Sequence, residues 1–213
     1  MSFQQLALFV PMAFMLAMLP GPDNLAVLAL GISNGRTASV GFGLGCAAGC
    51  LNHTVLAAVG VSALIAASPT AFRVLQYAGA AYLFWLGVRA LRSSGMQLQA
   101  ADSGARTSFG VQFRRGLIAN AINPKVALFF LALLPQFVRP EGWPGAAQII
   151  VLGLIIAASS AIVFCVIAVG AARIGTWLSR HERAALWADR ASALLFIGLG
   201  IRLALGELPH NTR

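Results

Sequence analysis

Residues 121–130 read AINPKVALFF and place one lysine in the middle of a long apolar stretch. Lys125 lies ten residues after Arg115 and fourteen before Arg139, the nearest arginines on either side. At a helical rise of about 1.5 Å per residue, these basic ends lie roughly 15 Å and 21 Å from the lysine. Because the hydrocarbon core of a bilayer is about 30 Å thick, a helix built from this segment would hold Lys125 near the midplane of a membrane.

An ammonium ion at that depth is energetically costly unless a neighbouring group compensates its charge. Insertion scales assign a lysine at the centre of a spanning helix a cost of about 2.5 to 3.5 kcal/mol. We therefore expect Lys125 to meet a partner, a water-filled cavity or a substrate. A structural ion pair between two helices is the alternative interpretation.

The composition places the rest of the chain in a membrane as well. Hydrophobic residues make up 59% of it and charged residues only 10%, whereas soluble domains carry about 25% charged residues. The uncharged runs 1–22, 37–72 and 142–172 are all long enough for a spanning helix of roughly 20 residues. These features predict an all-α integral membrane protein. We expect six transmembrane helices, at 4–33, 38–66, 71–91, 112–137, 146–170 and 191–207, with the first and the fourth broken by proline.

The net charge of +9 follows from membrane topology and does not indicate a nucleic-acid partner. Ten arginines fall in alternate connections between the expected spans, and four lie on the other side. By the positive-inside rule, the side with ten is cytoplasmic, which puts both termini outside. The ten are Arg36, Arg89, Arg92, Arg106, Arg114, Arg115, Arg173, Arg180, Arg183 and Arg190, and the four are Arg73, Arg139, Arg202 and Arg213.

The expected spans fall into two halves. Three precede a cytoplasmic linker at 93–109 and three follow it, so residues 1–92 and 110–213 would have opposite orientations within one transmembrane domain. The third span ends with Leu86-Gly87-Val88-Arg89 and the sixth with Leu199-Gly200-Ile201-Arg202. This pattern predicts two inverted three-helix repeats, whose broken helices would form a substrate site near the midplane.

The two breaks supply the candidate site. Proline lacks a backbone N–H and clashes with the preceding turn, so Pro22 and Pro124 would free carbonyl groups and start new half-helices. The N-terminus of a half-helix favours a carboxylate, and Lys125 adds a full positive charge while Asp23 adds a negative one. A site with one group of each sign matches a zwitterionic amino acid. We expect substrate binding by Asp23, Asn24, Asn120, Asn123 and Lys125, with helix breaks at Pro20, Gly21, Pro22 and Pro124.

A second interpretation of the acid remains open at this stage. Asp23 would then only cap its own half-helix and neutralise Lys125, without a role in binding. The two interpretations are compatible when no substrate is bound.

Several motifs together identify a family. Pro20-Gly21-Pro22 ends the first apolar segment, Asn123-Pro124-Lys125 is followed by Pro135-Gln136-Phe137, and Gly79-Ala80-Ala81-Tyr82-Leu83 precedes Gly87. These motifs resemble the LysE/RhtB family of bacterial amino-acid exporters, from residue 1 to about 207. The resemblance implies a multi-pass exporter of amino acids or close derivatives in the bacterial inner (plasma) membrane, driven by the proton gradient. Its partners would be a small amino acid, protons and the lipid bilayer, and a homo-oligomer is left open.

Cys46, Cys50 and His53 suggest a different class of function. Their spacing places two thiols and an imidazole on one face of a helix, which suits a soft metal ion. A heavy-metal cation exporter is therefore the alternative function, although Lys125 would repel a cation. The plainer interpretation is that the cysteines pack as small apolar side chains and that His53 hydrogen-bonds across the helix.

A membrane enzyme is the weakest of the three classes. No nucleophile, general base and orienting group recur at a credible spacing, and the sequence lacks a phosphate-binding loop. We expect no enzymatic activity and no cofactor.

Overall fold

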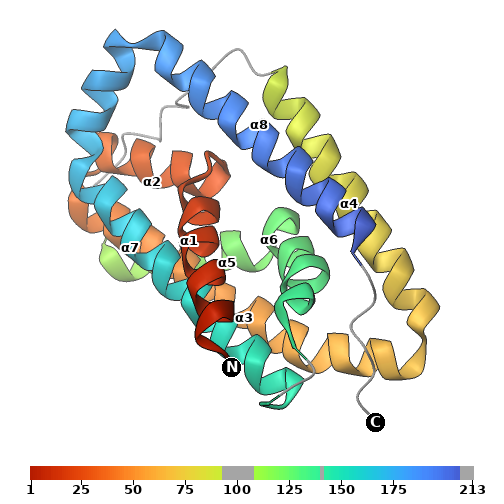
Figure 1. Cartoon of the computed structure of the whole chain (residues 1–213). Coiled ribbons are helices and arrows are strands. Elements are labelled where there is room, and N and C mark those ends of the chain that lie inside the picture. Colours follow the sequence, from red (N-terminus) through yellow and green to blue (C-terminus); the bar gives the residue numbers. More distant parts are fainter. Residues whose placement is uncertain (93–107, 140–141, 207–213) are drawn as a thin grey trace.

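The computed structural model describes residues 1–92, 108–139 and 142–206, and every regular element in these ranges is a helix (Figure 1). The predicted all-α class is confirmed. Most of the predicted linker, residues 93–107, lies outside the described residues. The elements are α1 (Phe3–Met18), α2 (Pro22–Ser33), α3 (Arg36–Ala67), α4 (Pro69–Leu91), α5 (Phe109–Ala121), α6 (Pro124–Leu128), the π-helix η1 (Phe129–Leu133), the 3-10 helix η2 (Leu134–Phe137), α7 (Gly145–Arg180) and α8 (Glu182–Leu205).

Two bends divide the helices that were expected to be broken. The axis turns by 56° between α1 and α2, and by 51° between α5 and the segment Pro124–Phe137. In both cases a proline occupies the first position of the new helix, Pro22 in α2 and Pro124 in α6. Proline is favoured there because its missing N–H has no role in the first turn and its φ is already helical. Both bends therefore follow from local backbone chemistry.

The structure supports a membrane protein and gives a smaller number of clear spans than the sequence predicts. By length and apolarity, α3 and α7 can each cross a membrane, and each bent pair can do so if it counts as one span, which makes two to four candidates among the described residues. Helices α4 and α8 were also expected to span, but polar and charged side chains lower their apolarity. Large apolar side chains, such as Leu8, Ile162 and Val166, are more than half exposed on the outer faces, as lipid contact requires.

The helices extend beyond their apolar parts. The fifth span was predicted to end at residue 170 and the sixth to begin at 191, whereas α7 continues to Arg180 and α8 begins at Glu182. Alanine, leucine and arginine fill much of these extensions and are strong helix formers. Helical structure therefore continues past residue 170 and begins before residue 191, beyond the predicted limits of the two spans.

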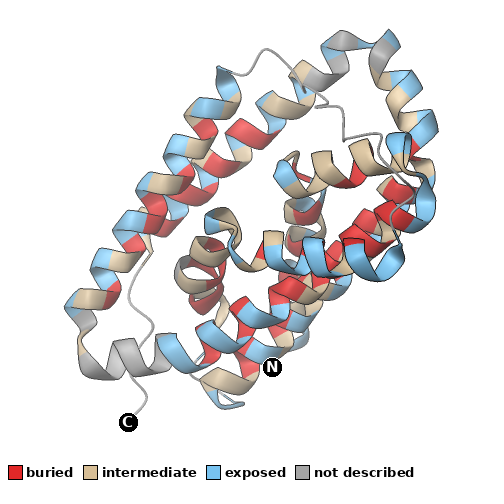
Figure 2. Cartoon of the chain, turned by 180° about the vertical axis from the view of Figure 1, so that it is seen from behind, coloured by how far each residue is buried: buried red, intermediate tan, exposed pale blue. Residues whose placement is uncertain are grey.

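The packing has two parts. Helix α3 packs against α5 and α7, and α7 packs against α1 and α2, while α4 and α8 run side by side at the edge of the molecule (Figures 1 and 2). Buried side chains follow the facing sides of these helices (Figure 2). Gly87 of α4 lies against Ala193 and Ile197 of α8, and Gly200 of α8 lies against Ala80 of α4. Gly87 and Gly200, the glycines of the repeated Leu-Gly motif, therefore both lie at the contact between α4 and α8.

Glycines bring α3 and α5 into backbone contact. Gly41, Gly45 and Gly49 are spaced by four residues along α3 and face α5, where Gly116 approaches α3 in turn. A Cβ added at Gly45 would overlap the carbonyl oxygen of Phe113. Small residues at such spacing let membrane helices pack closely. This contact fixes α5, and with it the second break, against α3.

We expect Gly45→Ala to destabilise the protein by about 1–3 kcal/mol, since forcing extra atoms into a filled interface displaces backbone. The measurement is the melting temperature of purified protein in detergent. Gly60→Ala in the same helix is the matched control because nothing lies within 4 Å of a Cβ at that position. Equal melting temperatures for the two variants would contradict the role given to the close α3–α5 contact.

Candidate functional site

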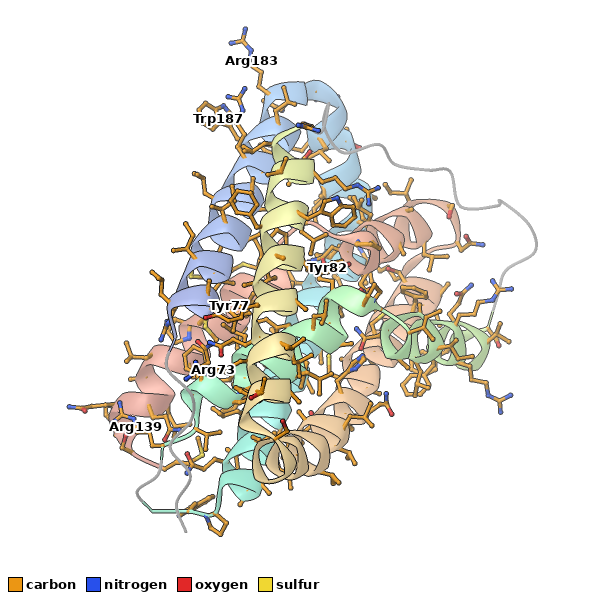
Figure 3. The ribbon with its side chains drawn as sticks, turned by 90° about the vertical axis from the view of Figure 1, so that its right-hand side faces the viewer. Arg73, Tyr77, Tyr82, Arg139, Arg183 and Trp187 are labelled. Carbon is orange, nitrogen blue, oxygen red and sulfur yellow. The ribbon has the colours of Figure 1, made fainter. Side chains whose placement is uncertain are left out.

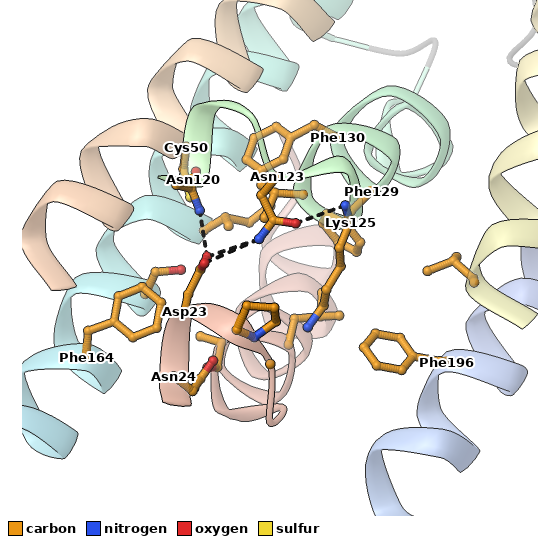
Figure 4. Close-up of a pocket in the computed structure, with 18 residues that line it drawn as sticks. Asp23, Asn24, Cys50, Asn120, Asn123, Lys125, Phe129, Phe130, Phe164 and Phe196 are labelled. Atoms are coloured by element: carbon orange, nitrogen blue, oxygen red, sulfur yellow. Dashed lines mark hydrogen bonds between the residues drawn. The ribbon is translucent and has the colours of Figure 1, made fainter. Parts of the chain in front are cut away.

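A cavity of about 670 Å³, including its open mouth, lies where the two breaks meet α3, α7 and the α4–α8 pair (Figure 4). All five predicted binding residues line it, together with Gly21 and Pro22 of the first break. Residues from α7, α4 and α8 complete the wall. The prolines therefore bring together side chains that lie about 100 positions apart in the sequence, as between Asp23 and Asn123.

Asp23 connects the two breaks. It lies in the first turn of α2, where a carboxylate interacts favourably with the helix N-terminus. The side-chain amide of Asn120 donates to Asp23 Oδ2 at 3.0 Å, and that of Asn123 donates to both carboxylate oxygens at 3.3 and 3.4 Å. The acid thus joins α2 to the end of α5 and the start of α6.

Asn123 acts on both sides of the second break. Its Oδ1 accepts a hydrogen bond from the backbone N–H of Lys125 at 3.1 Å and so caps α6. Its amide nitrogen is left to donate to Asp23. One side chain therefore fixes the direction of α6 and the position of the carboxylate, and the N-termini of α2 and α6 both face the cavity region (Figure 4).

The side chain of Lys125 runs from the start of α6 toward the first break, and the Phe196 ring lies beside its tip (Figure 4). Its ammonium lies 4.7 Å from the centre of the Phe196 ring of α8, within range of a cation–π interaction. A Cβ at Gly21 would come within 3.0 Å of the same Nζ atom, so glycine leaves room for the ammonium. Within the described part of the chain, no nitrogen–oxygen contact of 4.0 Å or less pairs Lys125 with Asp23. Both charges therefore line one cavity without forming an ion pair.

The carbonyl groups freed by the breaks have partners. In a continuous helix the carbonyl of Ala17 would accept a hydrogen bond from the backbone N–H of residue 21. Here it accepts from the side-chain amide of Asn24 at 2.8 Å. In a continuous helix the carbonyl of Asn120 would accept from the N–H of residue 124, but residue 124 is a proline and has no N–H. The carbonyl of Asn120 is bonded instead by the N–H of Asn123 at 2.9 Å and by Nε2 of His53, also at 2.9 Å. Asn24 and His53 thus stabilise the two breaks.

The alternative metal site does not form. His53 Nε2 is committed to the Asn120 carbonyl, a bond that requires the ring to carry a proton on that nitrogen. Cys46 is buried in the packing between α3 and α7, whereas Cys50 lines the cavity. Among the described residues, no three His, Cys, Asp or Glu side chains converge to hold a metal ion. Helical spacing put the trio on one side of α3, but the break at Pro124 gives His53 a different partner.

We expect His53→Leu to lower the free energy of unfolding by about 0.5–1.5 kcal/mol. The buried Asn120 carbonyl loses one of its two donors and keeps the N–H of Asn123. His53→Gln keeps a donating nitrogen and should recover part of that loss. Thermal unfolding in detergent, with and without added Cd²⁺, measures both effects. Stabilisation of the wild type by Cd²⁺ that disappears in both variants would restore the metal interpretation.

Three wall residues of α7 were not among the predicted binding residues. Ile156, Ser160 and Phe164 face the cavity at intervals of four along α7. Because α7 is apolar on all sides, its sequence offers no periodic signal that separates a cavity face from a lipid face. Phe196 was missed for a similar reason, since an aromatic residue in an apolar helix is ordinary.

Known proteins identify the family. The LysE type translocator family matches residues 14–207. The chain belongs to this family. It is therefore a membrane transporter and not an enzyme, and the resemblance expected from the proline and lysine motifs is confirmed.

The relatives of this LysE family protein cover nearly its whole length. A homoserine/homoserine lactone efflux protein of Salmonella typhimurium is 31% identical over 204 residues, which cover 96% of this chain and 98% of that protein. A leucine efflux protein of Enterobacter sp. is 29% identical over 196 residues, with 92% and 93% covered. An uncharacterised membrane protein of Pseudomonas aeruginosa is 36% identical over 200 residues, with 90% of each covered. No solved structure matches the chain.

Proposed function

We propose that this LysE family protein exports amino acids or close derivatives across the bacterial inner membrane by alternating access, in exchange for protons. The observation that carries the proposal is the pair of opposite charges, Asp23 and Lys125, that line one cavity without pairing. Efflux of homoserine and of leucine by two relatives supports the substrate class.

The charges assign the two ends of the substrate. Lys125 would hold the carboxylate, because its ammonium is the one basic side chain among the described residues that line the cavity. Asp23 would hold the ammonium. A carboxylate has about four lone-pair positions, so Asp23 can accept from a substrate while it accepts from Asn120 and Asn123. The cation–π contact with Phe196 is weaker than a charged hydrogen bond, so a carboxylate would compete well for Lys125.

Proton coupling would act through Asp23. When the carboxylate is protonated it loses its charge and therefore its attraction for the ammonium group of the substrate. A proton that enters from outside would thus favour release of the amino acid outside. Protons would return to the cytoplasm on the same residue.

Two inverted three-helix repeats would place this site at their interface, as in other exchangers with broken helices. The packing supports this arrangement because the long helix of each half packs on the broken helix of the other, α3 on α5 and α7 on α1 and α2. The two edge helices, α4 and α8, pack on each other. In this proposal residues 1–92 and 110–213 form the repeats, and all six predicted spans cross the membrane.

The proposed orientation has both termini outside and the linker in the cytoplasm. Arg183 and Trp187 lie at one end of the molecule, and Arg73 and Arg139 lie toward the other, as opposite membrane faces would require (Figure 3). In a variant without its native cysteines, a cysteine at position 103 should react only with reagents that enter the cell, and one at position 2 should react from outside. The reverse pattern would overturn the orientation.

Counterflow in proteoliposomes tests the function. Vesicles that contain the protein and an unlabelled amino acid should accumulate the same radiolabelled amino acid, and vesicles without protein should not. Cd²⁺ and Ni²⁺ are tested in the same vesicles. Uptake of a metal ion with no exchange of any amino acid would favour the metal exporter.

A further inference from the structure

We infer that the cavity selects neutral zwitterionic amino acids with an apolar side chain, and that it discriminates against polar and charged side chains. This inference rests on the proposed function, since it assigns a substrate class to the same site. Two observations support it: the amide groups of the cavity are hydrogen-bonded within the protein, and the other lining residues are mainly apolar.

The amide groups of the cavity are largely committed to the protein. Asn120 and Asn123 donate to Asp23, and the oxygen of Asn123 accepts from the backbone of Lys125. The nitrogen of Asn24 is bonded to the carbonyl of Ala17. These hydrogen bonds engage all three amide nitrogens in holding the two breaks together. The oxygen of Asn120, which is buried without a hydrogen-bond partner among the described residues, and the hydroxyl of Ser160 remain outside this set.

The rest of the wall is mainly apolar. On α7, Ile156 and Phe164 flank Ser160, and Leu83 of α4 and Phe196 of α8 close the opposite side. Phe164 lies on the Asp23 side of the cavity and Phe196 on the Lys125 side (Figure 4). A substrate held by its two charged ends would therefore direct its side chain against aliphatic and aromatic surface.

Charge adds a second constraint. Of the described residues that line the cavity, Asp23 is the one acid and Lys125 the one base. The backbone groups of a zwitterion occupy both. A lysine or glutamate side chain would then be a third charge in an apolar cavity without a partner, which is strongly unfavourable. A substrate without a free carboxylate would leave Lys125 unpaired for the same reason.

The decisive experiment compares norvaline with homoserine, two amino acids that differ by a methyl group in place of a hydroxyl. In proteoliposome exchange, we expect norvaline to be transported with a kcat/KM about tenfold or more above that of homoserine, because the substrate hydroxyl loses its water against a wall that is mainly apolar apart from Ser160. Leucine should have the next highest kcat/KM after norvaline. Lysine, glutamate and leucine amide should compete at least tenfold more weakly.

A matched pair of variants tests the location of the selectivity. Ile156→Thr adds a hydroxyl to the cavity wall and should raise homoserine exchange relative to norvaline by severalfold. Ile162→Thr makes the same change at a side chain of α7 that is 53% exposed on the outer surface, and the ratio should stay that of the wild type. An unchanged ratio in a folded Ile156→Thr protein would place the side-chain subsite elsewhere.

The outcomes separate this inference from the proposed function. Homoserine or lysine exchanged as fast as norvaline, and lost in Lys125→Met, would overturn the apolar selectivity and leave the exporter function intact. Exchange of no zwitterion at all would overturn both. The wild-type norvaline and homoserine rates decide the question even if Ile156→Thr fails to fold.

Discussion

Lys125→Met should abolish amino-acid exchange while the protein still reaches the membrane. Methionine has a similar length and removes the charge, so the substrate carboxylate would lose its charged partner. Loss of one member of a buried charged pair costs about 2–5 kcal/mol, which is roughly thirtyfold or more in kcat/KM. Insertion should not suffer, because the charge that costs energy in the bilayer is gone. The measurement is exchange by purified protein in vesicles, normalised to the amount of folded transporter.

Lys125→Arg provides the matched control for charge. It keeps the positive charge but replaces a compact ammonium by a planar guanidinium with different donor directions. Gly21 and the Phe196 ring already lie close to Nζ, so the larger group has little room. We expect poor recovery of exchange. Normal exchange by Lys125→Met would return the lysine to a structural role, and full activity of Lys125→Arg would show that charge alone is enough.

The sequence predicted the parts of the site that carry strong local signals. Proline has one chemical consequence in a helix, so the bends at Pro22 and Pro124 were visible before the structure. A lysine in an apolar segment is costly, which singled out Lys125. In these cases the residue type alone determines the local physics, whatever surrounds it.

Other features depend on tertiary contacts and could not be read from one helix at a time. The binding partner of His53 is the carbonyl of Asn120, 67 positions away in the sequence, which Pro124 leaves without its helical donor. The cavity face of α7 exists only because the breaks pack against it. The glycine spacing of α3 was a usable signal, since Gly41, Gly45 and Gly49 recur every four residues, but it does not say which helix they meet.

Exchanging the charges of Asp23 and Lys125 should not restore activity, because the two side chains do not form an ion pair. A direct ion pair would let Asp23→Lys and Lys125→Asp compensate each other. Instead, Asp23 accepts from two amide donors, and a lysine at position 23 would place a third donor among them. We expect the double reversal to be as inactive as either single reversal.

Asp23→Asn should remove the dependence of export on the proton gradient and reduce its rate. The amide keeps the size of the side chain and one acceptor oxygen for Asn120 or Asn123, so the junction of the two breaks should survive. It has no negative charge for an ammonium and cannot exchange a proton at ordinary pH. Efflux from vesicles, with and without an imposed pH gradient, should therefore differ severalfold or more for the wild type and hardly at all for Asp23→Asn.

Asp23→Ala separates the structural role of the acid from its role in coupling. Alanine leaves two amide donors without their acceptor, and unmet buried donors cost about 1–3 kcal/mol each. It should therefore lose thermal stability as well as transport, whereas Asp23→Asn should lose mainly transport. Full stimulation of Asp23→Asn by the pH gradient would assign proton coupling to another group. Equal melting temperatures for Asp23→Ala and the wild type would show that the carboxylate does not hold the breaks together.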